Sequence, residues 1–554
     1  MKKNIIVIVI AIALALLLTL VAGCGGSDAP QTPATPGATS GNAAVAQSGA
    51  LMHANEQGID TLIVGTIADL ESPSRLVYNF DVYTGTLSQL APVYIDENAE
   101  VHPLATLFAT TDFRTWTLTV IDGLTWHDGV SVTADDIKFT IESNALHDTG
   151  APQTTYSEIN VRDARTLDLV LPAPNVRHMS GLTTLRLYPK HEFANLADRA
   201  DATVEQMTLG NGPFKFAGFD TEAGTFTFEA YDDFVWGRPN VDTVIFRQFG
   251  SPDMMNLALK AGEIDMVYAY AGGITASAAA DLETSPNIRL IPIKDTSNPA
   301  VLVFNNNTSP GNDANIRRAV AHAINYDAVH NLFGSPYSVR TTAGFVPSGS
   351  LGFIDTPELS RDLQKAREYL AAAGATNTEG NGVAMYNGAP LTIELMVRSD
   401  IPVYERYAEL LKLNLADVGI DLVFRITDVP TFREVTENTH AHQLMITRFT
   451  AFGMNMQAGM GTAYITGRGA SLGQAQVFDP EFDAILDRLR TAATLDAYIS
   501  AAAETQTYYA ENLPALALLW DSYIQAVSSG LDGFFVDGTF GLLNAFTWFS
   551  IHEI

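Results

Sequence analysis

The sequence predicts an α/β protein with mixed sheets in more than one lobe. Three observations support this fold class. β-rich segments alternate with helical ones, the chain contains no internal repeat, and residues 57–554 are enough for two or three domains. The formal net charge of −30 makes nucleic acid and anionic lipid headgroups unfavourable partners, although solubility explains this acidity as well as a cationic ligand does.

Predicted strands are short segments rich in aliphatic, aromatic and β-branched residues, and most are bounded by turn residues. Their order along the chain already suggests short strands with helices between them. The predicted strands are 62–67, 116–121, 167–171, 225–230, 241–249, 302–305, 391–397 and 421–426.

The first well-marked helix begins at a capping box and runs toward Asn144. In this box the Thr133 hydroxyl and the Asp136 carboxylate satisfy backbone donors that lack helical partners. The paired aspartates 135 and 136 are therefore interpreted as a helix start and not as an acid/base pair. Two further helices are expected at 361–373 and 403–418, where Gly374 and Gly419 provide C-terminal stops.

Asp313 is expected to cap another helix, which continues through Asn331. The spacing predicts that Arg317 and Arg318 lie outside its apolar face. That face is formed by Ile316, Val320, Ala323 and Ile324.

The N-terminus predicts export. Lys2 and Lys3 precede an apolar run over 5–22, and Cys24, the only cysteine of the chain, follows small residues. Residues 21–24 (VAGC) resemble a bacterial lipobox, in which the cysteine is lipidated and becomes the mature N-terminus. We therefore expect a signal peptide over 1–23. An uncleaved membrane anchor is the alternative, since the run approaches the ~20 residues that span a bilayer.

Residues 24–56 are expected to be the lipidated cysteine and a flexible tether. From 25 to 50 the chain consists of small and polar residues with a single charge at Asp28, so it cannot bury enough apolar surface to fold. The folded part is thus predicted to lie on the cell surface or periplasmic side, anchored to the membrane through lipid on Cys24.

Two enzyme-like or metal-like patterns compete with a binding function. Residues 469–473 match G-x-S-x-G around Ser471, but the helix that should follow the serine has no room before Asp479 and Pro480. His440 and His442 can share one face of a strand, but no neighbouring cluster completes a metal site. We therefore expect no catalytic residue, no bound metal and no cofactor.

Several motifs resemble the family 5 extracellular solute-binding proteins, the peptide and nickel receptors of ABC importers. The first match is GLTWHDG at 123–129, followed by VTADDIKFT at 132–140. Further matches follow in the family's order over nearly the whole mature chain: GNGPF at 210–214, YDDFVWGRPNVDTVIFR at 231–247, AGEID at 261–265, NIRRAVAHAINYDAV at 315–329 and the A-x-x-L-L-x-x-A-G-like run at 366–374.

This resemblance implies a bilobed periplasmic-binding-protein-like fold of type II, in its large three-region variant, with mixed sheets in each lobe. Two crossovers, near Pro299 and near Tyr523, would form the hinge. By analogy, the core of lobe 1 is expected at 57–78, 200–299 and 526–554, with an inserted region at 79–199, and lobe 2 at 300–525.

The same resemblance implies a monomeric binding protein that captures an oligopeptide or peptide-like solute between its lobes and delivers it to the membrane subunits of an ABC permease. Ligand contacts made with both lobes would favour the closed state. A metal or metal-complex receptor, which would use His440, His442, Met454, Met456 or Met460, stays an alternative, and a secreted hydrolase using Ser471 is more remote.

The ligand contacts are expected in the cleft. The acid that usually binds the ligand's α-ammonium in this family is missing from the corresponding stretch. Peptide receptors of this family carry an acid for the α-ammonium in the stretch that corresponds to 445–457, which here has no carboxylate. The expected contacts, each with an alternative structural role, are Asp69, Glu71, Tyr268, Tyr270, Asn305, Asn306, Arg448, Phe449, Phe452, Met454, Asn455, Met456 and Trp520.

Overall fold

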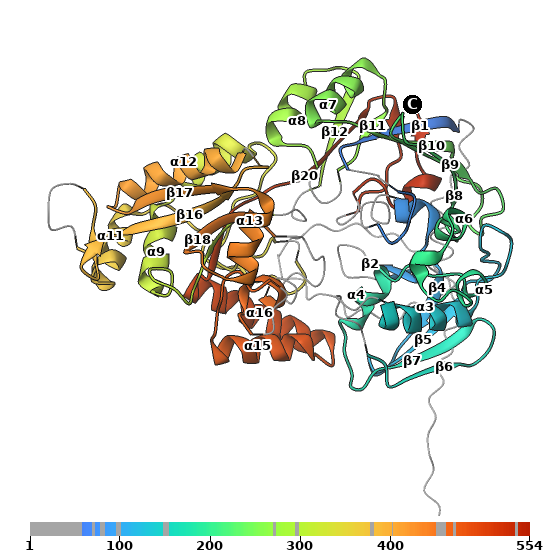
Figure 1. Cartoon of the computed structure of the whole chain (residues 1–554), viewed down its shortest axis with the longest axis horizontal. Helices are drawn as coiled ribbons and strands as arrows, with labels where there is room; N and C mark the ends of the chain where they lie inside the picture. The colour runs from blue at the N-terminus through green and yellow to red at the C-terminus, as the bar shows by residue number, and fades with distance from the viewer. Residues whose placement is uncertain are drawn as a thin grey trace, which may run out of the picture. The chain divides into compact units, whose positions relative to one another are not determined.

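The computed structural model of the chain contains two large mixed sheets, of seven and five strands, each with its own helices (Figure 1). Within the described part, no helix combines the length and apolar character that crossing a bilayer requires. The structure describes residues 58–68, 72–77, 84–95, 101–147, 155–269, 273–293, 299–348, 350–376, 382–401, 403–449, 461–468, 472–537 and 541–554.

Lobe 1 is built on a seven-stranded mixed sheet with the strand order β12-β20-β11-β1-β10-β9-β8. Strand β1 pairs in parallel with β10 and β11, whereas β20 pairs antiparallel with β11 and β12. The strands are β1 (Ile59–Thr66), β8 (Phe214–Asp220), β9 (Thr225–Ala230), β10 (Val241–Gln248), β11 (Met266–Val267), β12 (Ile288–Ile293) and β20 (Tyr523–Ser528).

Two helices of lobe 1 lie beside this sheet near β11 and β12 (Figure 1). Helix α7 (Pro252–Ala261) is capped by Ser251 and ends at Gly262, whose φ of 71° suits a residue without a Cβ. Helix α8 (Ala276–Leu282) is capped by Thr275. Two short strands close the C-terminal segment, β21 (Leu531–Asp532) and β22 (His552–Glu553).

A four-stranded antiparallel sheet of order β4-β5-β7-β6 lies between β1 and β8 in sequence. The Asp136 carboxylate accepts hydrogen bonds from the Thr133 N–H and hydroxyl, both at 2.8 Å. The carboxylate half of the predicted capping box is therefore confirmed, whereas the hydroxyl half is wrong, because the Thr133 hydroxyl donates to the carboxylate and the Asp136 N–H binds the Thr133 backbone carbonyl. The elements here are β2 (Val93–Ile95), β3 (Val101–Pro103), β4 (Thr106–Ala109), β5 (Thr115–Val120), α3 (Ala134–His147), β6 (Glu158–Val161), β7 (Thr166–Val170), α4 (His178–Thr183), α5 (Lys190–Phe193) and α6 (Val204–Thr208).

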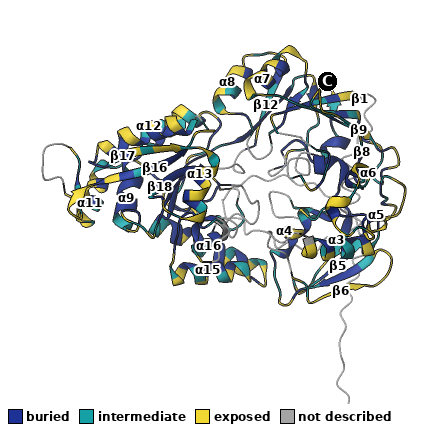
Figure 2. Cartoon of the chain, in the orientation of Figure 1, coloured by how far each residue is buried: buried dark blue, intermediate teal, exposed yellow. Residues whose placement is uncertain are grey.

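Lobe 2 is built on a five-stranded mixed sheet of order β17-β16-β18-β13-β19. Strand β19 is buried along its whole length and β18 along all but its last residue, and Figure 2 shows the outward sides of helices such as α12 exposed. Its strands are β13 (Pro299–Phe304), β16 (Thr392–Arg398), β17 (Asp421–Thr427), β18 (Leu444–Arg448) and β19 (Ala515–Trp520), with a small hairpin of β14 (Met385–Tyr386) and β15 (Ala389–Pro390).

The helices of lobe 2 pack on this sheet or extend from it (Figure 1). Gly374 and Gly419 adopt φ values of 77° and 85° after two of them, so the predicted glycine stops are confirmed. The helices are α9 (Ala314–Ala323), α10 (Tyr326–Val329), α11 (Leu363–Ala372), α12 (Val403–Ala416), α13 (Val429–Arg433), α15 (Pro480–Arg490) and α16 (Leu495–Asn512).

The prediction of one helix from Asp313 to Asn331 is wrong. Asp313 does cap α9, but Ile324 is extended with a ψ of 133°, and the Asn325 side chain caps the separate helix α10. The expectation that Arg317 lies outside the apolar face is also wrong, because Arg317 is only 7% exposed. Its guanidinium donates to the carbonyls of Gly311 and Asn512, which stabilise it inside lobe 2.

The chain passes between the two large sheets twice, from β12 to β13 and from β19 to β20. These are the two crossovers that the bilobed fold requires, at the positions expected from the sequence. All eight predicted strands also coincide with observed strands to within a few residues. The strands that the sequence did not predict include β18, β19 and β20, whose continuous burial removes the alternating pattern.

Candidate functional site

The carboxyl ends of four strands meet at one edge of the lobe 2 sheet. Strands β18 and β19 run antiparallel to β13, while β16 runs parallel to β18 and β17 parallel to β16. The last residues of these strands therefore lie at the edge where Pro299 begins β13, next to both crossovers. In open α/β sheets, ligands bind beyond the carboxyl ends of strands, so this edge is the candidate site.

Charged residues gather at this edge. The Arg398 guanidinium donates two hydrogen bonds to Asp400, at 3.0 and 2.6 Å, and this holds the pKa of that carboxyl below its usual value. Arg448, at the end of β18, is exposed, and Asp521 follows β19 directly. In the described part of the chain, neither the Arg448 guanidinium nor the Asp521 carboxylate has a hydrogen-bond or ion-pair partner.

The electrostatic state of Asp521 is unusual for a carboxyl group. Burial raises its pKa from 3.8 to about 7, and the positive charge of Arg448 only partly opposes this. Two tyrosines of α12, Tyr404 and Tyr407, are close enough to interact electrostatically with Asp521. A half-buried carboxyl without a donor gains its missing interaction from a cationic or N–H-bearing ligand.

Two of the predicted aromatic contacts meet in the core beneath this edge. Phe449 is fully buried and stacks on Tyr464 with ring centroids 4.0 Å apart. Phe345 contacts Phe449 edge-on at 5.9 Å and also lies 6.4 Å from Trp520, which is 2% exposed. Both predicted residues therefore contribute to one apolar layer, in which large aromatic surfaces are buried.

The predicted asparagines hold the backbone of lobe 2. The Asn305 amide donates to the carbonyls of His440 and His442, at 2.8 and 3.0 Å. The Asn306 amide donates to three carbonyls, including those of Ala475 and Pro514. Tyr268, in lobe 1, is 1% exposed.

Seven predicted ligand contacts and the lipidation site lie outside the described residues. The same holds for Ser471, whereas the first described helix after it is α15, which begins at Pro480 under an Asp479 cap. The predicted site residues that lie outside the described residues are Asp69, Glu71, Tyr270, Phe452, Met454, Asn455, Met456 and Cys24.

Two of the sequence motifs contact each other in the folded protein. The His127 ring nitrogens lie 3.0 Å from the Gly212 carbonyl oxygen and 3.3 Å from the Gly210 N–H. Burial lowers the pKa of His127 to about 4, so the neutral ring donates through Nε2 and accepts at Nδ1. The GLTWHDG motif thus fixes the glycine turn that precedes β8.

The histidine pair at 440 and 442 is engaged in backbone contacts. His442 is fully buried with Nε2 2.8 Å from the Gln474 carbonyl, and burial lowers its pKa to about 4. His440 places Nδ1 2.9 Å from the Thr436 carbonyl. Among the described residues, the one group with metal-ligand spacing is Asp128, His191 and Glu192, away from this pair.

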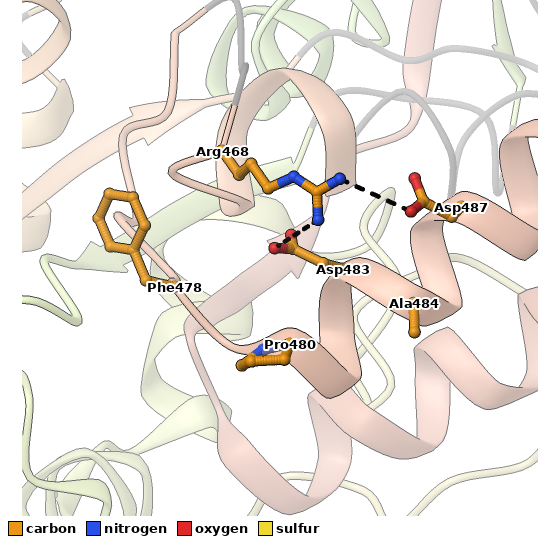
Figure 3. Close-up of a pocket in the computed structure, with 6 residues that line it drawn as sticks. All are labelled: Arg468, Phe478, Pro480, Asp483, Ala484 and Asp487. Atoms are coloured by element: carbon orange, nitrogen blue, oxygen red, sulfur yellow. Dashed lines mark hydrogen bonds and ion pairs between the residues drawn. The ribbon is translucent and has the colours of Figure 1, made fainter.

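Two cavities occur elsewhere on the described surface. The first, of about 410 Å³, adjoins α15, and there Arg468 bridges Asp483 at 3.3 Å and Asp487 at 3.8 Å (Figure 3). Its charged groups are therefore already paired with one another. The second, of about 360 Å³, lies between α7 and α8.

Asp521 is the candidate residue that the sequence reasoning missed. It is the first charged residue after the apolar run of β19 (ALALLW), and that position was the only available signal. The missing information is the pairing of β19 with β13, which brings Asp521 to the same edge as Arg448.

Comparisons with known proteins identify the fold and the family. The model of the bacterial extracellular solute-binding proteins, family 5 Middle, matches residues 101–471. The oligopeptide-binding protein AppA from Bacillus subtilis, solved with a nonapeptide, superposes with a TM-score of 0.72 at 18% identity, over 90% of this chain and 100% of that one. NikA from Brucella suis, solved with Fe(III)-EDTA, gives a TM-score of 0.79 at 16% identity, over 89% of this chain and 100% of that one.

A curated relative is an ABC transporter peptide-binding protein of Brucella ovis, 28% identical over 322 residues. The match covers 56% of this chain and 57% of the relative, so the chain spans little more than half the length of that protein. The family model, in contrast, covers most of the described chain, including β13, β16, β17 and β18 of the lobe 2 sheet. On this basis the chain belongs to the bacterial extracellular solute-binding proteins, family 5.

Proposed function

We propose that this protein is the substrate-binding component of an ABC importer, which captures an oligopeptide or peptide-like solute between its lobes and delivers it to the permease. Family membership, the two crossovers and the relatives described as peptide-binding proteins support this proposal. The function is binding and conformational change, with no catalytic residue. A ligand that contacts both lobes favours their closed arrangement.

The observation that carries the proposal is the unpartnered pair at the lobe 2 edge. A peptide has an α-ammonium, a carboxylate and backbone N–H and C=O groups. Asp521 offers a carboxylate for the ammonium or an N–H, and Arg448 offers a guanidinium for a carboxylate or carbonyl. Asp521 thereby takes the part of the acid that is missing from 445–457.

We propose further contacts on the basis of family position. Together with Arg448 and Asp521, the residues expected from the sequence would contact the ligand in the cleft. These residues are Asp69, Glu71, Tyr268, Tyr270, Asn305, Asn306, Phe449, Phe452, Met454, Asn455, Met456 and Trp520.

We also propose that the receptor is tethered outside the cell. The family is one of extracellular proteins. A signal peptide at 1–23, lipid on Cys24 and a tether to residue 56 would hold the lobes close to the membrane. Lobe 1 would comprise 57–78, 200–299 and 526–554 with the inserted region 79–199, and lobe 2 would comprise 300–525.

A thermal-shift screen of the chain from Gly25 onward tests the function. Peptide pools graded by length and charge are compared with the same pools after N-terminal acetylation, and with divalent metal ions. A ligand at 100 times its Kd adds about 2.7 kcal/mol to stability, which raises the Tm measurably. We expect a shift with unmodified peptides and a smaller one with acetylated peptides.

The variant Asp521→Asn makes this screen specific for the proposed site. It should reduce the difference between unmodified and acetylated peptides, while Asp400→Asn, at the neighbouring carboxyl that already has an arginine partner, should keep it. A shift with metals and with no peptide would replace the peptide proposal by a metal receptor.

A further inference from the structure

A contact between the two lobes lies far from both crossovers in the sequence. The Val176 N–H donates to the Ala492 carbonyl at 3.0 Å, and the Asn175 side-chain amide donates to the Arg490 carbonyl at 3.3 Å. Asn175 and Val176 precede α4, next to the four-stranded sheet, whereas Arg490 ends α15 of lobe 2. Figure 1 shows α4 on the side of its lobe that is nearer to α15 and α16.

The acceptors of this contact are backbone carbonyls at the C-terminal end of α15 and just beyond it. The last carbonyls of an α-helix find no N–H donor within the helix, and they carry a partial negative charge. The Arg490 carbonyl is such a group, and the Ala492 carbonyl follows it just beyond the Thr491 cap of α15; lobe 1 supplies an N–H donor to each. Arg177, the next residue of the donor segment, adds a positive charge close to Tyr498 of α16.

Apolar residues from both lobes seal the contact. Val176, Leu489 and Tyr498 are fully buried and belong to the same hydrophobic cluster, together with Ala492. His178 is 4% exposed beside them, and neither of its ring nitrogens has a hydrogen-bond partner among the residues that the structure describes. Its ring packs edge-on against Trp116 and Tyr156, at 5.1 and 5.4 Å. The contact is therefore a packed interface.

We infer that the segment Asn175–Arg177 and the C-terminal end of α15 form a latch that holds the two lobes closed at a point separate from the crossovers. This inference rests on the proposed function, in which the lobes open to admit a solute. Opening the lobes breaks both hydrogen bonds and exposes the apolar seal. The latch therefore sets how much of the unliganded protein is closed, and how long a captured solute is retained.

An isosteric substitution tests the latch without disturbing its local turn. The Asn175 Oδ1 atom accepts the Arg177 N–H at 3.0 Å, and Asn175→Asp keeps this acceptor while it replaces the amide donor by a carboxylate facing the Arg490 carbonyl. We expect a larger radius of gyration in small-angle scattering of the unliganded protein. The dissociation rate of a fluorescent peptide pool should rise about 2- to 10-fold, the range for one hydrogen bond.

Asn160→Asp is the matched control, because the Asn160 amide is exposed and binds only the nearby Glu158. It should leave the scattering and the dissociation rate unchanged. An Asn175→Asp protein that is equally compact and releases peptide at the wild-type rate would overturn the latch.

A reversible cross-link provides the second test. The chain from Gly25 onward has no cysteine, so Val176→Cys with Ala492→Cys introduces a single pair across the latch. Oxidation should form a disulfide faster than in the control pair Asn160→Cys with Leu413→Cys. Protein that is oxidised without ligand should not bind the peptide pool, and protein that is oxidised with bound peptide should not release it. Reduction of the disulfide should restore both binding and release.

These readouts separate the two proposals. If the unmodified protein binds no peptide, the proposed ligand class is wrong, whereas scattering and the cross-linking rate still decide the latch. Cross-linking no faster than in the control pair, or cross-linked protein that exchanges peptide freely, would refute the latch and leave the peptide proposal standing.

Discussion

At the residue scale, three buried histidines make the fold sensitive to acid. Burial lowers the pKa of His127, His178 and His442 from 6.5 to about 4. The unfolded chain therefore binds more protons than the folded one between these values. The stability that depends on neutral rings is fully present above pH 6.5 and is lost as the pH falls toward 4.

His178 gives the clearest test of this linkage, because its ring makes no hydrogen bond within the described part of the chain. For a pKa of 6.5 unfolded and about 4 folded, the cost at pH 5 is roughly 2 kcal/mol, and it is negligible at pH 8. His178→Phe should therefore raise the free energy of unfolding more at pH 5 than at pH 8. Urea unfolding at both pH values measures this, and equal changes would contradict it.

Asp521 has the opposite dependence on pH. Its folded pKa of about 7 exceeds its ordinary value of 3.8, so the folded protein binds the extra proton, and the charged carboxylate destabilises the fold as the pH rises through 7. We expect Asp521→Asn to raise the free energy of unfolding by about 1–3 kcal/mol at pH 8, with little effect at pH 4. A destabilised Asp521→Asn protein at pH 8, measured by urea unfolding, would argue against a buried charge.

The sequence predicted part of the candidate site, and the remaining features could not be predicted because they depend on contacts between distant parts of the chain. Arg448 could be found because it lies in the stretch 445–457 that corresponds to the ligand-binding segment of the family, and Trp520 because it lies next to the second expected crossover. The engaged amides of Asn305 and Asn306 could not be predicted, since every carbonyl to which they donate, except that of Phe304, lies more than 130 positions away in the sequence. Asp521 was missed because only strand pairing shows that a carboxyl lies half-buried without a donor.

At the element scale, the glycine turn before β8 depends on the close approach of two backbones. A Cβ on Gly212 would lie 2.4 Å from the Leu87 carbonyl oxygen and 2.6 Å from the Ser88 carbonyl carbon. The Asn211 and Gly212 N–H groups both donate to the Ser88 carbonyl at 2.9 Å, which holds the segments together. Only a residue without a side chain fits this position.

Gly212→Ala should therefore destabilise the protein by at least about 2 kcal/mol, because backbone atoms must move to admit the methyl group. Gly218→Ala is the control in β8, since a Cβ there meets nothing within 4 Å. Thermal unfolding should show a clear decrease in Tm for Gly212→Ala and almost none for Gly218→Ala. Similar decreases for both would show that the turn tolerates the methyl group.

Helix α9 illustrates what a sequence pattern predicts and what it leaves out. Its start was predictable from Asp313, whereas its end was not, because the residues around Ile324 carry no glycine or proline. Arg317 looked exposed because arginine is seldom buried, but the end of α16 supplies its acceptors from almost 200 residues away. Tertiary partners override local patterns at both points.

Arg317→Met tests this buried arginine by keeping most of its apolar stem and removing its hydrogen bonds. The carbonyls of Gly311 and Asn512 would lose their donors, so we expect a loss of about 2–4 kcal/mol in urea unfolding. Arg318→Met, at the neighbouring half-buried arginine, should cost less than about 1 kcal/mol. Equal losses would contradict a specific role for Arg317.

At the scale of the whole molecule, the chain returns at its C-terminal end to complete lobe 1. Strand β20 lies between β11 and β12, and it pairs with all six residues of β12. Beyond it, Trp548 is fully buried with its ring 5.1 Å from that of Phe214, and Phe546 stacks on Trp236 at 6.0 Å. The alternation of strands and helices predicted the fold class, but this discontinuous pairing was accessible only through the family resemblance.

Lobe 1 should therefore be unable to fold without the C-terminal segment. A chain that ends at Asp521 loses β20, which exposes unpaired edges on β11 and β12 and uncovers the aromatic surface around Phe214 and Trp236. We expect it to aggregate on expression, while removal of the 78% exposed Ile554 alone should leave a soluble protein. A soluble, cooperatively unfolding chain that ends at Asp521 would mean that the first three hundred residues close the lobe by themselves. The second crossover would then serve only to join the lobes, and would not be needed to build one.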